Sequence, residues 1–399
     1  MKVLIATMTC GEGHNAIARS IRDGFSAEDD VRILDIYAHL QKRDWYGKAY
    51  LFLVKHFPKS YTYFWNRLRK KNPERRYGRL VMGNTKNAIG EIERVLAEFQ
   101  PDAVICTHNY ASNAFCWLKI HNRFQGKLYS VFFDYVACPY WEGSVLCDGI
   151  FTPHEITHTE LISRGFRKEQ LLPFGFPVNP KFYEPISKRQ ARESLGIGED
   201  EYVVLSVNGG FGVGKIASLI PHLKKAKTGG KKLRVLVVCG RNKRAYRKAL
   251  KLVEKRGYEG VDVYGFVNNL PVMYSAADFV FLRGGGGSVS EALVKGVPFA
   301  VRERAVSQEK ENGKLFAGYG VSYIMNRISD ARTILEKQMN DSPLQTEGGG
   351  VLYRDLSVVK ASQRWSLISA HSTRSNNKSN NLRARSFSCL EKDPAFFVA

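Results

Sequence analysis

The stretch that decides the fold runs from residue 278 to residue 298: Asp278-Phe-Val-Phe-Leu-Arg-Gly-Gly-Gly-Gly-Ser-Val-Ser-Glu291-Ala-Leu-Val-Lys-Gly296-Val-Pro298. An apolar run, four glycines and a helical pattern predict a buried parallel strand that turns directly into a helix. The first amides of such a helix lack internal acceptors and lie at its positive dipole end, so the junction favours a phosphate. A glycine-rich turn of any doubly wound α/β protein is the alternative.

Polar side chains follow this junction where a sugar nucleotide would need them. Glu291 lies one turn inside the predicted helix, where a carboxylate can accept hydrogen bonds from ribose hydroxyls. Gln308, Glu309 and Asn312 follow the next predicted strand, 298–302, and could ring a polyhydroxylated ligand. Phosphate, ribose and sugar contacts together predict a nucleotide-sugar. The amides expected to meet its phosphates are those of Gly286, Gly287 and Ser288.

A second glycine junction lies at the N-terminus. The apolar strand Lys2-Val-Leu-Ile-Ala-Thr is followed by Met8-Thr-Cys-Gly11-Glu-Gly13-His14 and an amphipathic helix. His14 is therefore expected in the first turn of a helix at the carboxyl end of a strand, where open α/β sheets bind ligands. The helix dipole disfavours an imidazolium there, so a neutral imidazole able to act as a base is plausible. A structural histidine is the alternative.

The chain resembles the diacylglycerol glycosyltransferase and monogalactosyldiacylglycerol synthase family over residues 1 to 335. The resemblance rests on Gly11-x-Gly13-His14-x-x-x-Ala18, on Glu291-Ala-Leu-x-x-Gly296-x-Pro298 with the glycines before it, and on Gln308-Glu309-x-x-Asn312. Met82-Gly-Asn84, expected before a helix, and Gly175-Phe-Pro177-Val agree with it. It implies a GT28-type enzyme of the inverting GT-B group, which also includes the peptidoglycan enzyme that transfers N-acetylglucosamine to a lipid.

The resemblance implies a role for each site residue. His14 corresponds to the histidine that faces the acceptor in relatives and is the candidate base. Asp134, after a predicted strand, could instead be the base or orient His14, and a turn aspartate is its structural alternative. The donor would be held by Gly13, by the loop that contains Gly209 and Gly210, and by Phe266 and Val267, which resemble the family's uracil-facing turn. No Asp-x-Asp motif stands where a metal-dependent transferase needs one, so neither a metal nor a cofactor is expected beyond the UDP-sugar donor.

The order of strand and helix patterns predicts an α/β protein of GT-B type, with two Rossmann-like doubly wound domains facing across a cleft. Residues 1–178 would form an acceptor- and membrane-binding domain, and residues 179–340 a UDP-sugar-binding domain. The proline- and glycine-rich segment 173–185 reads as the hinge between them. From residue 345 the chain is polar and rich in Asn and Ser, which predicts a disordered tail where relatives end in helices.

Composition limits the compartment. The seven cysteines have no paired short spacing, which argues against a disulfide framework or a zinc site. No signal peptide and no run of eighteen apolar residues is present, so we expect a peripheral protein at the cytoplasmic face of the plasma membrane, with no transmembrane helix.

A basic segment, residues 42–86, stands out from the rest of the chain. It carries thirteen Lys or Arg residues against two acidic ones, interleaved with aromatic residues from Trp45 to Trp65. Aromatic rings with a cationic rim suit the interface of an anionic bilayer. They also suit single-stranded nucleic acid, and some of the apolar positions suit a helix core. With a lipid-modifying family in view, anionic membrane lipids are the favoured partner and nucleic acid is not.

Two departures from the family pattern lie near the donor. Relatives usually have a proline after the basic residue at position 283 and a Pro-Gly pair before the Gln-Glu, but this chain has Gly284 and Val306-Ser307. Both changes affect backbone shape.

The sequence therefore predicts transfer of glucose or galactose from UDP-hexose to diacylglycerol or a glycosyl-diacylglycerol. Two alternatives remain: N-acetylglucosaminyl transfer to a polyprenyl-linked cell-wall precursor, and an inactive relative that binds membrane or nucleic acid. The choice of hexose, the number of sugars added, the acceptor lipid and the oligomeric state stay open.

Replacing Arg69, Lys70, Lys71, Arg75 and Arg76 by Ser tests the basic segment. If it docks on lipid, the unchanged protein binds anionic vesicles and is released by salt, because exposed charges are screened. The variant should lose this binding in a vesicle sedimentation assay and keep its thermal midpoint. Tighter binding to single-stranded RNA than to the vesicles at equal salt would contradict the lipid assignment.

Overall fold

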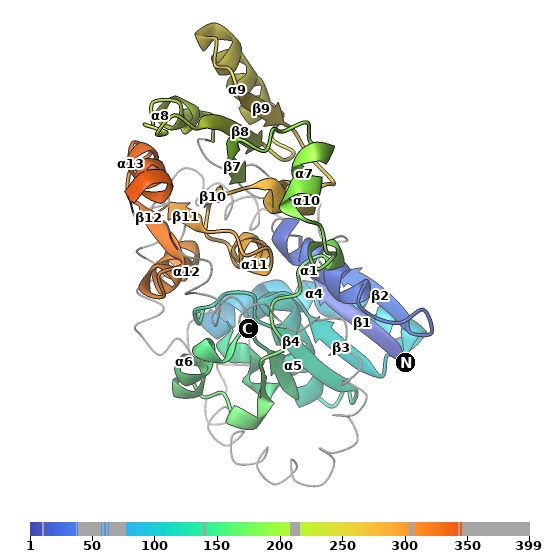
Figure 1. Cartoon of the computed structure of the whole chain (residues 1–399). Coiled ribbons are helices and arrows are strands. Elements are labelled where there is room, and N and C mark those ends of the chain that lie inside the picture. Colours follow the sequence, from blue (N-terminus) through green and yellow to red (C-terminus); the bar gives the residue numbers. More distant parts are fainter. Residues whose placement is uncertain are drawn as a thin grey trace.

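Two six-stranded sheets, in which every paired strand is parallel, form the frame of the protein (Figure 1). The structure is a computed structural model, and it describes residues 1–9, 12–36, 38, 57, 60, 63, 77–138, 141–207, 216–302, 307–341 and 344. Helices join the strands, so the α/β prediction is confirmed. The predicted domain boundary at residue 178 falls between the last strand of the first sheet and the first strand of the second.

The first sheet has the order β2-β1-β3-β4-β5-β6. Its central strands are buried along almost their whole length, because helices cover both faces of a parallel sheet. The strands are β1 (Lys2–Thr7), β2 (Asp30–Asp35), β3 (Ala103–Cys106), β4 (Lys127–Val131), β5 (Gly149–Phe151) and β6 (Leu171–Leu172). The helices are α1 (Glu12–Arg22), α4 (Tyr77–Phe99), α5 (Asn109–Ile120) and α6 (His158–Ser163), with short 3₁₀ turns at Glu142–Leu146, Glu155–Thr157 and Lys168–Gln170.

The second sheet has the order β12-β11-β10-β7-β8-β9. Its strands are β7 (Glu201–Val207), β8 (Lys232–Val238), β9 (Val261–Tyr264), β10 (Phe279–Leu282), β11 (Phe299–Arg302) and β12 (Ser322–Met325). The helices are α7 (Lys188–Ser194), α8 (Ile220–Leu223), α9 (Lys243–Arg256), α10 (Leu270–Ala276), α11 (Gly286–Val294), α12 (Ser307–Gly318) and α13 (Asp330–Glu336). Two 3₁₀ turns, Pro180–Phe182 and Ile216–Ser218, and a π turn, Lys337–Asp341, complete the described elements.

The strand order of each sheet determines where a ligand can bind. In the first sheet the chain passes from β1 to β2 on one side and then returns to β3 on the other, so the order reverses between β1 and β3. In the second sheet the same reversal falls between β7 and β10. Loops diverge at such a switch point and leave a crevice at the carboxyl ends of the strands. Both glycine junctions lie at these points, one after β1 and one after β10.

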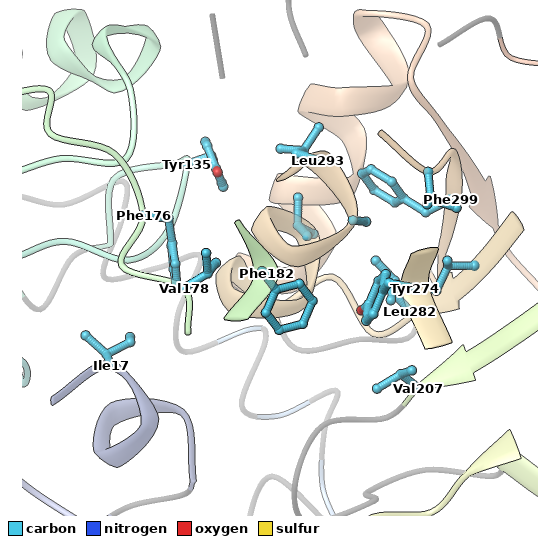
Figure 2. Packing of buried hydrophobic residues seen from close by; sticks show 14 of the residues in the cluster. Ile17, Tyr135, Phe176, Val178, Phe182, Val207, Tyr274, Leu282, Leu293 and Phe299 are labelled. Atoms are coloured by element: carbon cyan, nitrogen blue, oxygen red, sulfur yellow. The ribbon is translucent and has the colours of Figure 1, made fainter. Parts of the chain in front are cut away.

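One apolar cluster connects the two sheets through residues 173–185, the segment that joins the two domains and is called the linker below. Phe176 and Val178 of the linker pack in the same cluster as Ile17 of α1, Tyr135 and Leu293 of α11 (Figure 2). Burial of these side chains holds the halves together, because apolar area removed from water contributes about 25 cal/mol per Å². The linker is therefore part of the core of the protein.

Some sequence-based expectations need correction or lie outside the described residues. Met82-Gly83-Asn84 does not precede a helix but lies inside α4, which begins at Tyr77. Most of the basic segment, the loop with Gly209 and Gly210, and the whole chain from residue 345 lie outside the described residues. Among the helices that the structure describes, none combines the length and the apolar character needed to cross a membrane.

Gly284, which stands where relatives usually have proline, adopts a conformation that proline cannot. Its φ is +97°, whereas the proline ring holds φ near about −65°. A Cβ at this position would also collide with the backbone oxygen of Glu309 and lie 2.5 Å from Cγ1 of Val301. Glycine is thus required twice, by the backbone angle and by the close approach of α12.

Gly284→Ala should therefore destabilise the protein more than Gly257→Ala. Gly257 also has a positive φ, +57°, but nothing lies within 4 Å of an added Cβ. The control variant carries only the left-handed strain, about 1–2 kcal/mol. Gly284→Ala adds overpacking, typically about 1–3 kcal/mol more. Urea unfolding midpoints of both variants measure the difference, and equal losses would contradict the close-approach argument.

Candidate active site

His14 lies in the first turn of α1, at the carboxyl end of β1. Its Nδ1 is 2.7 Å from the backbone oxygen of Thr107, which can only accept, so Nδ1 carries the proton. Nε2 is then the unprotonated nitrogen, and no described residue bonds to it. Burial lowers the pKa of His14 from 6.5 to about 4, although the Thr107 bond acts in the opposite sense. The imidazole is therefore neutral at physiological pH and available as a proton acceptor.

His108 is the functional candidate that sequence reasoning missed. It follows β3, the other strand of the switch point, and its ring centroid is 4.4 Å from that of His14. Phe133 contacts the His14 ring edge-on, with the centroids 4.6 Å apart. The available signal is a histidine directly after the predicted strand 103–107, but without the strand order nothing links it to His14.

Asp134 is not a hydrogen-bond partner of His14 among the described residues. Its buried Oδ1 accepts a hydrogen bond from Nδ2 of Asn312 at 3.0 Å. The backbone oxygen of Thr107 orients the His14 ring, a role that the sequence analysis considered for Asp134. Burial, with a smaller contribution from Glu309, raises the pKa of Asp134 to about 7, while the Asn312 bond lowers it.

Asn312 joins the two domains and is fully buried. Its Nδ2 also donates to the backbone oxygen of Gly284 at 3.1 Å, and its Oδ1 accepts from the amide of Tyr135 at 3.0 Å. Tyr135 continues the contact, because its hydroxyl lies 2.7 Å from Oγ of Ser290 on α11. The amide of Asn312 is thus used within the protein, and we assign it to the interface between the domains rather than to the ring of sugar contacts.

The N-terminus of α11 lies directly against the loop after β4. A Cβ on Gly286 would collide with the backbone oxygen of Phe133 and lie 3.0 Å from the Phe176 ring. The first three amides of α11 belong to Gly286, Gly287 and Ser288, and a helix leaves such amides without internal acceptors. A helix N-terminus of the kind that suits a phosphate therefore lies in the second domain, against the same loop whose Phe133 contacts His14 in the first.

Glu291 lies on α11 beside Tyr274. Burial raises its pKa to about 7, against a smaller lowering by the Tyr274 hydrogen bond. The carboxyl group is therefore close to its titration point at physiological pH.

Gln308 and Glu309 begin α12 and differ in their surroundings. Oε1 of Gln308 is buried and has no hydrogen-bond partner among the described residues. A buried acceptor without a donor is costly, which favours a ligand hydroxyl at this point. Glu309 accepts hydrogen bonds from Nε and Nη2 of Arg283, at 3.3 and 3.0 Å.

The remaining predicted donor contacts within the described residues are Gly13, Phe266 and Val267. Space is open around Gly13, where an added Cβ would meet nothing within 4 Å. Phe266 is half exposed with the Arg241 guanidinium over its ring, 4.8 Å from the centroid, and Val267 packs on the core. Over the described ranges, no group of three or more His, Cys, Asp or Glu side chains is arranged to hold a metal ion.

The pKa of Asp134 predicts a pH dependence of stability. Its folded pKa, about 7, is above the ordinary 3.8, so the folded state keeps a proton that the unfolded state releases. This contribution to stability is complete below pH 3.8 and is lost as pH rises to about 7. Asp134→Asn keeps an acceptor for Asn312 and removes the titration, so its unfolding free energy should fall less between pH 4.5 and 7.5. Parallel urea titrations measure this, and identical slopes would contradict the assignment.

Comparison with protein-family models shows two matches that together span most of the chain. Residues 13–178 match monogalactosyldiacylglycerol (MGDG) synthase. Residues 204–345 match the glycosyltransferase family 28 C-terminal domain. The first match contains strands β2 to β6 of the first sheet, and the second match contains most of β7 and all of β8 to β12.

Individual relatives agree with the family models. The chain is 29% identical over 329 residues to a probable chloroplastic monogalactosyldiacylglycerol synthase of Glycine max, covering 78% of this chain and 60% of that protein. It is 24% identical over 349 residues to a processive diacylglycerol beta-glucosyltransferase of Bacillus pumilus, covering 85% and 86%. The chain thus spans less than two thirds of the plant relative.

The fold matches a solved structure of Anabaena HepE in complex with UDP, with a TM-score of 0.55 and 14% identity, covering 93% of this chain and 100% of that one. At that identity the likeness concerns the fold, two Rossmann-like domains of GT-B type. The chain belongs to the family of monogalactosyldiacylglycerol synthases and diacylglycerol glucosyltransferases.

Proposed function

We propose that this protein is an inverting glycosyltransferase that moves glucose or galactose from UDP-hexose to diacylglycerol or a glycosyl-diacylglycerol. One observation carries the proposal: Phe133, beside the neutral His14, also lies against the N-terminus of α11. A proton acceptor and an anion-binding helix terminus thus adjoin one loop. The names of the relatives, an MGDG synthase and a diacylglycerol glucosyltransferase, support the acceptor.

His14 would start the chemistry at the acceptor. A lipid hydroxyl is a weak nucleophile until a base takes its proton, and Nε2 of His14 is the unprotonated nitrogen of the ring. The hydroxyl oxygen then bonds to the anomeric carbon of the hexose, while the bond from that carbon to the UDP oxygen breaks. Attack opposite the leaving group inverts the anomeric centre. The negative charge that develops on the diphosphate meets the amides of α11 and the positive end of its dipole.

Donor recognition would be divided along α11 and α12. Glu291 is the proposed contact to the ribose, Gln308 and Glu309 to the hexose, and Phe266 with Val267 to the uracil. The unpaired Oε1 of Gln308 supports a hexose hydroxyl as its partner. Gly209 and Gly210 keep their predicted phosphate role, outside the described residues. The bound UDP of the Anabaena structure supports a UDP donor.

We place the reaction at the cytoplasmic face of the plasma membrane, with the protein bound peripherally. The acceptor is a membrane lipid, and the basic segment is the proposed contact to anionic lipids. That segment lies largely outside the described residues, so its charge pattern is the support for this part of the proposal.

The assay for the proposed function offers the full chain several donors in parallel. Anionic vesicles with diacylglycerol receive UDP-glucose, UDP-galactose or UDP-N-acetylglucosamine, and the lipid products are separated by chromatography. We expect one hexosyl donor to yield glycosyl-diacylglycerol and His14→Ala to slow it by about 10²- to 10⁴-fold, as for a lost general base. Transfer of N-acetylglucosamine alone, or none from any donor, would overturn the proposal.

Calorimetric binding of UDP and UDP-hexose tests the division of donor contacts. Glu291→Ala should weaken both ligands, because both contain the ribose. Gln308→Ala should weaken only UDP-hexose, by about 0.5–1.5 kcal/mol for a lost neutral hydrogen bond. Lys314→Ala serves as the control, because Lys314 is exposed and lies on α12 together with Gln308. Equal losses for UDP in both site variants would contradict the division.

A further inference from the structure

His108 is held in one orientation and one tautomer by the start of α5. It is the N-cap of that helix, and its Nδ1 accepts a hydrogen bond from the amide of Tyr110 at 3.1 Å. A nitrogen that accepts carries no proton, so the proton of the neutral ring lies on Nε2. Burial lowers the pKa of His108 well below its usual value, and the proximity of His14 adds to this. The side chain is 6% exposed and stays neutral.

The same ring forms one wall around His14. The two imidazole planes are tilted by 56°, and Phe133 meets His14 at 86°. Tyr110 stacks on His108 with the centroids 5.4 Å apart and the planes 25° apart, which supports it from α5. Thr107, the residue before His108, provides the oxygen that binds Nδ1 of His14. One dipeptide after β3 therefore anchors the candidate base and encloses it.

Two requirements of a general base explain why such an enclosure matters. The base must be unprotonated when the acceptor arrives, and it must direct one nitrogen to the hydroxyl. The Thr107 bond satisfies the second requirement by setting the tautomer. Exclusion of water extends the first condition to lower pH, since a solvated imidazole binds a proton near pH 6.5 and a desolvated one does so at lower pH.

We propose that His108 is a positioning residue for His14: its capped ring and Phe133 together shield two sides of the half-buried His14 imidazole from water and leave Nε2 for the acceptor. This inference rests on the proposed role of His14 as base. The helix cap explains the Nδ1 contact alone. It does not explain why an aromatic ring stands against a second histidine at the switch point.

Among the described residues, no charged side chain contributes to the lowered pKa of His14. Asp134 follows Phe133, but its carboxyl group faces Asn312 and is itself raised in pKa. Asp35, on β2, is hydrogen-bonded by Thr9. The pKa of His14 is accordingly set by burial and by the Thr107 bond. Loss of the His108 wall should thus raise it toward 6.5, the value for a solvated ring.

Two substitutions separate the cap from the wall. His108→Asn keeps an oxygen at the position of Nδ1 to accept from the Tyr110 amide but removes the ring. His108→Phe keeps a ring but removes the acceptor. His108→Ser, a strong helix cap with a small side chain, repeats the first change should the Asn variant fail to fold. The full chain, labelled with ¹⁵N-histidine, gives the His14 titration by NMR without any substrate.

We expect His14 to titrate near pH 4 in the unchanged protein. In the Asn and Ser variants it should titrate about 1–2 units higher as water enters. The acidic limb of kcat/KM should move upward by the same amount. In the Phe variant the titration and the limb should stay in place, while loss of the helix cap lowers the thermal midpoint.

Three outcomes would overturn the inference: a His14 that titrates near 6.5 in the unchanged protein, an unshifted His14 in the Asn or Ser variant, or an equal shift in the Phe variant. The first needs no variant. Failure of the proposed function appears separately, as a lack of transfer from every UDP-sugar, because the NMR titration does not depend on turnover.

Discussion

The hydrogen bonds of Asn312 are the interaction on which the arrangement of the site depends. Each sheet has its own buried strands, but the two carboxyl edges form one site only if they stay together. Asn312 bonds Asp134 and Tyr135 of the first domain and Gly284 of its own. A fully buried amide with every bond satisfied specifies one geometry, since any shift would leave polar atoms unpaired in a medium that does not solvate them. The apolar linker cluster supplies attraction between the domains, and Asn312 supplies their register.

Close packing reinforces that register. Gly286 admits the Phe133 carbonyl where any other residue would collide with it, and Gly284 admits the backbone of α12. The glycine run therefore has two functions. Its amides lie at a helix N-terminus, where a helix provides no internal acceptors, and its missing side chains let one domain approach the other. A sequence pattern read only as a phosphate loop accounts for the first function and omits the second.

The glycine junctions and the strands were predictable because their signals are local. An apolar run followed by glycines and a helical pattern shows in a dozen residues, and His14 and Glu291 could be placed on their helices in this way. The strand order was not readable from such patterns, because it depends on contacts between distant segments. For the same reason local patterns do not reveal the proximity of His108 to His14 or the bonds of Asn312 to the other domain. Residues 14 and 108 become neighbours only once β1 and β3 pair.

Burial shifts the titratable groups of the site in one common sense, toward the neutral form. The pKa of His14 falls to about 4, and those of Asp134 and Glu291 rise to about 7. Arg283, the basic residue before the glycines, is paired with Glu309. Oriented backbone dipoles at α11 therefore offer a diphosphate an attraction that does not depend on the ionisation of these side chains. Such dipoles are fixed before the ligand arrives and need no reorganisation as charge develops on the leaving group. A site of this kind can keep its base neutral and still stabilise an anion, because the stabilising dipoles belong to the backbone of α11 and the imidazole belongs to α1.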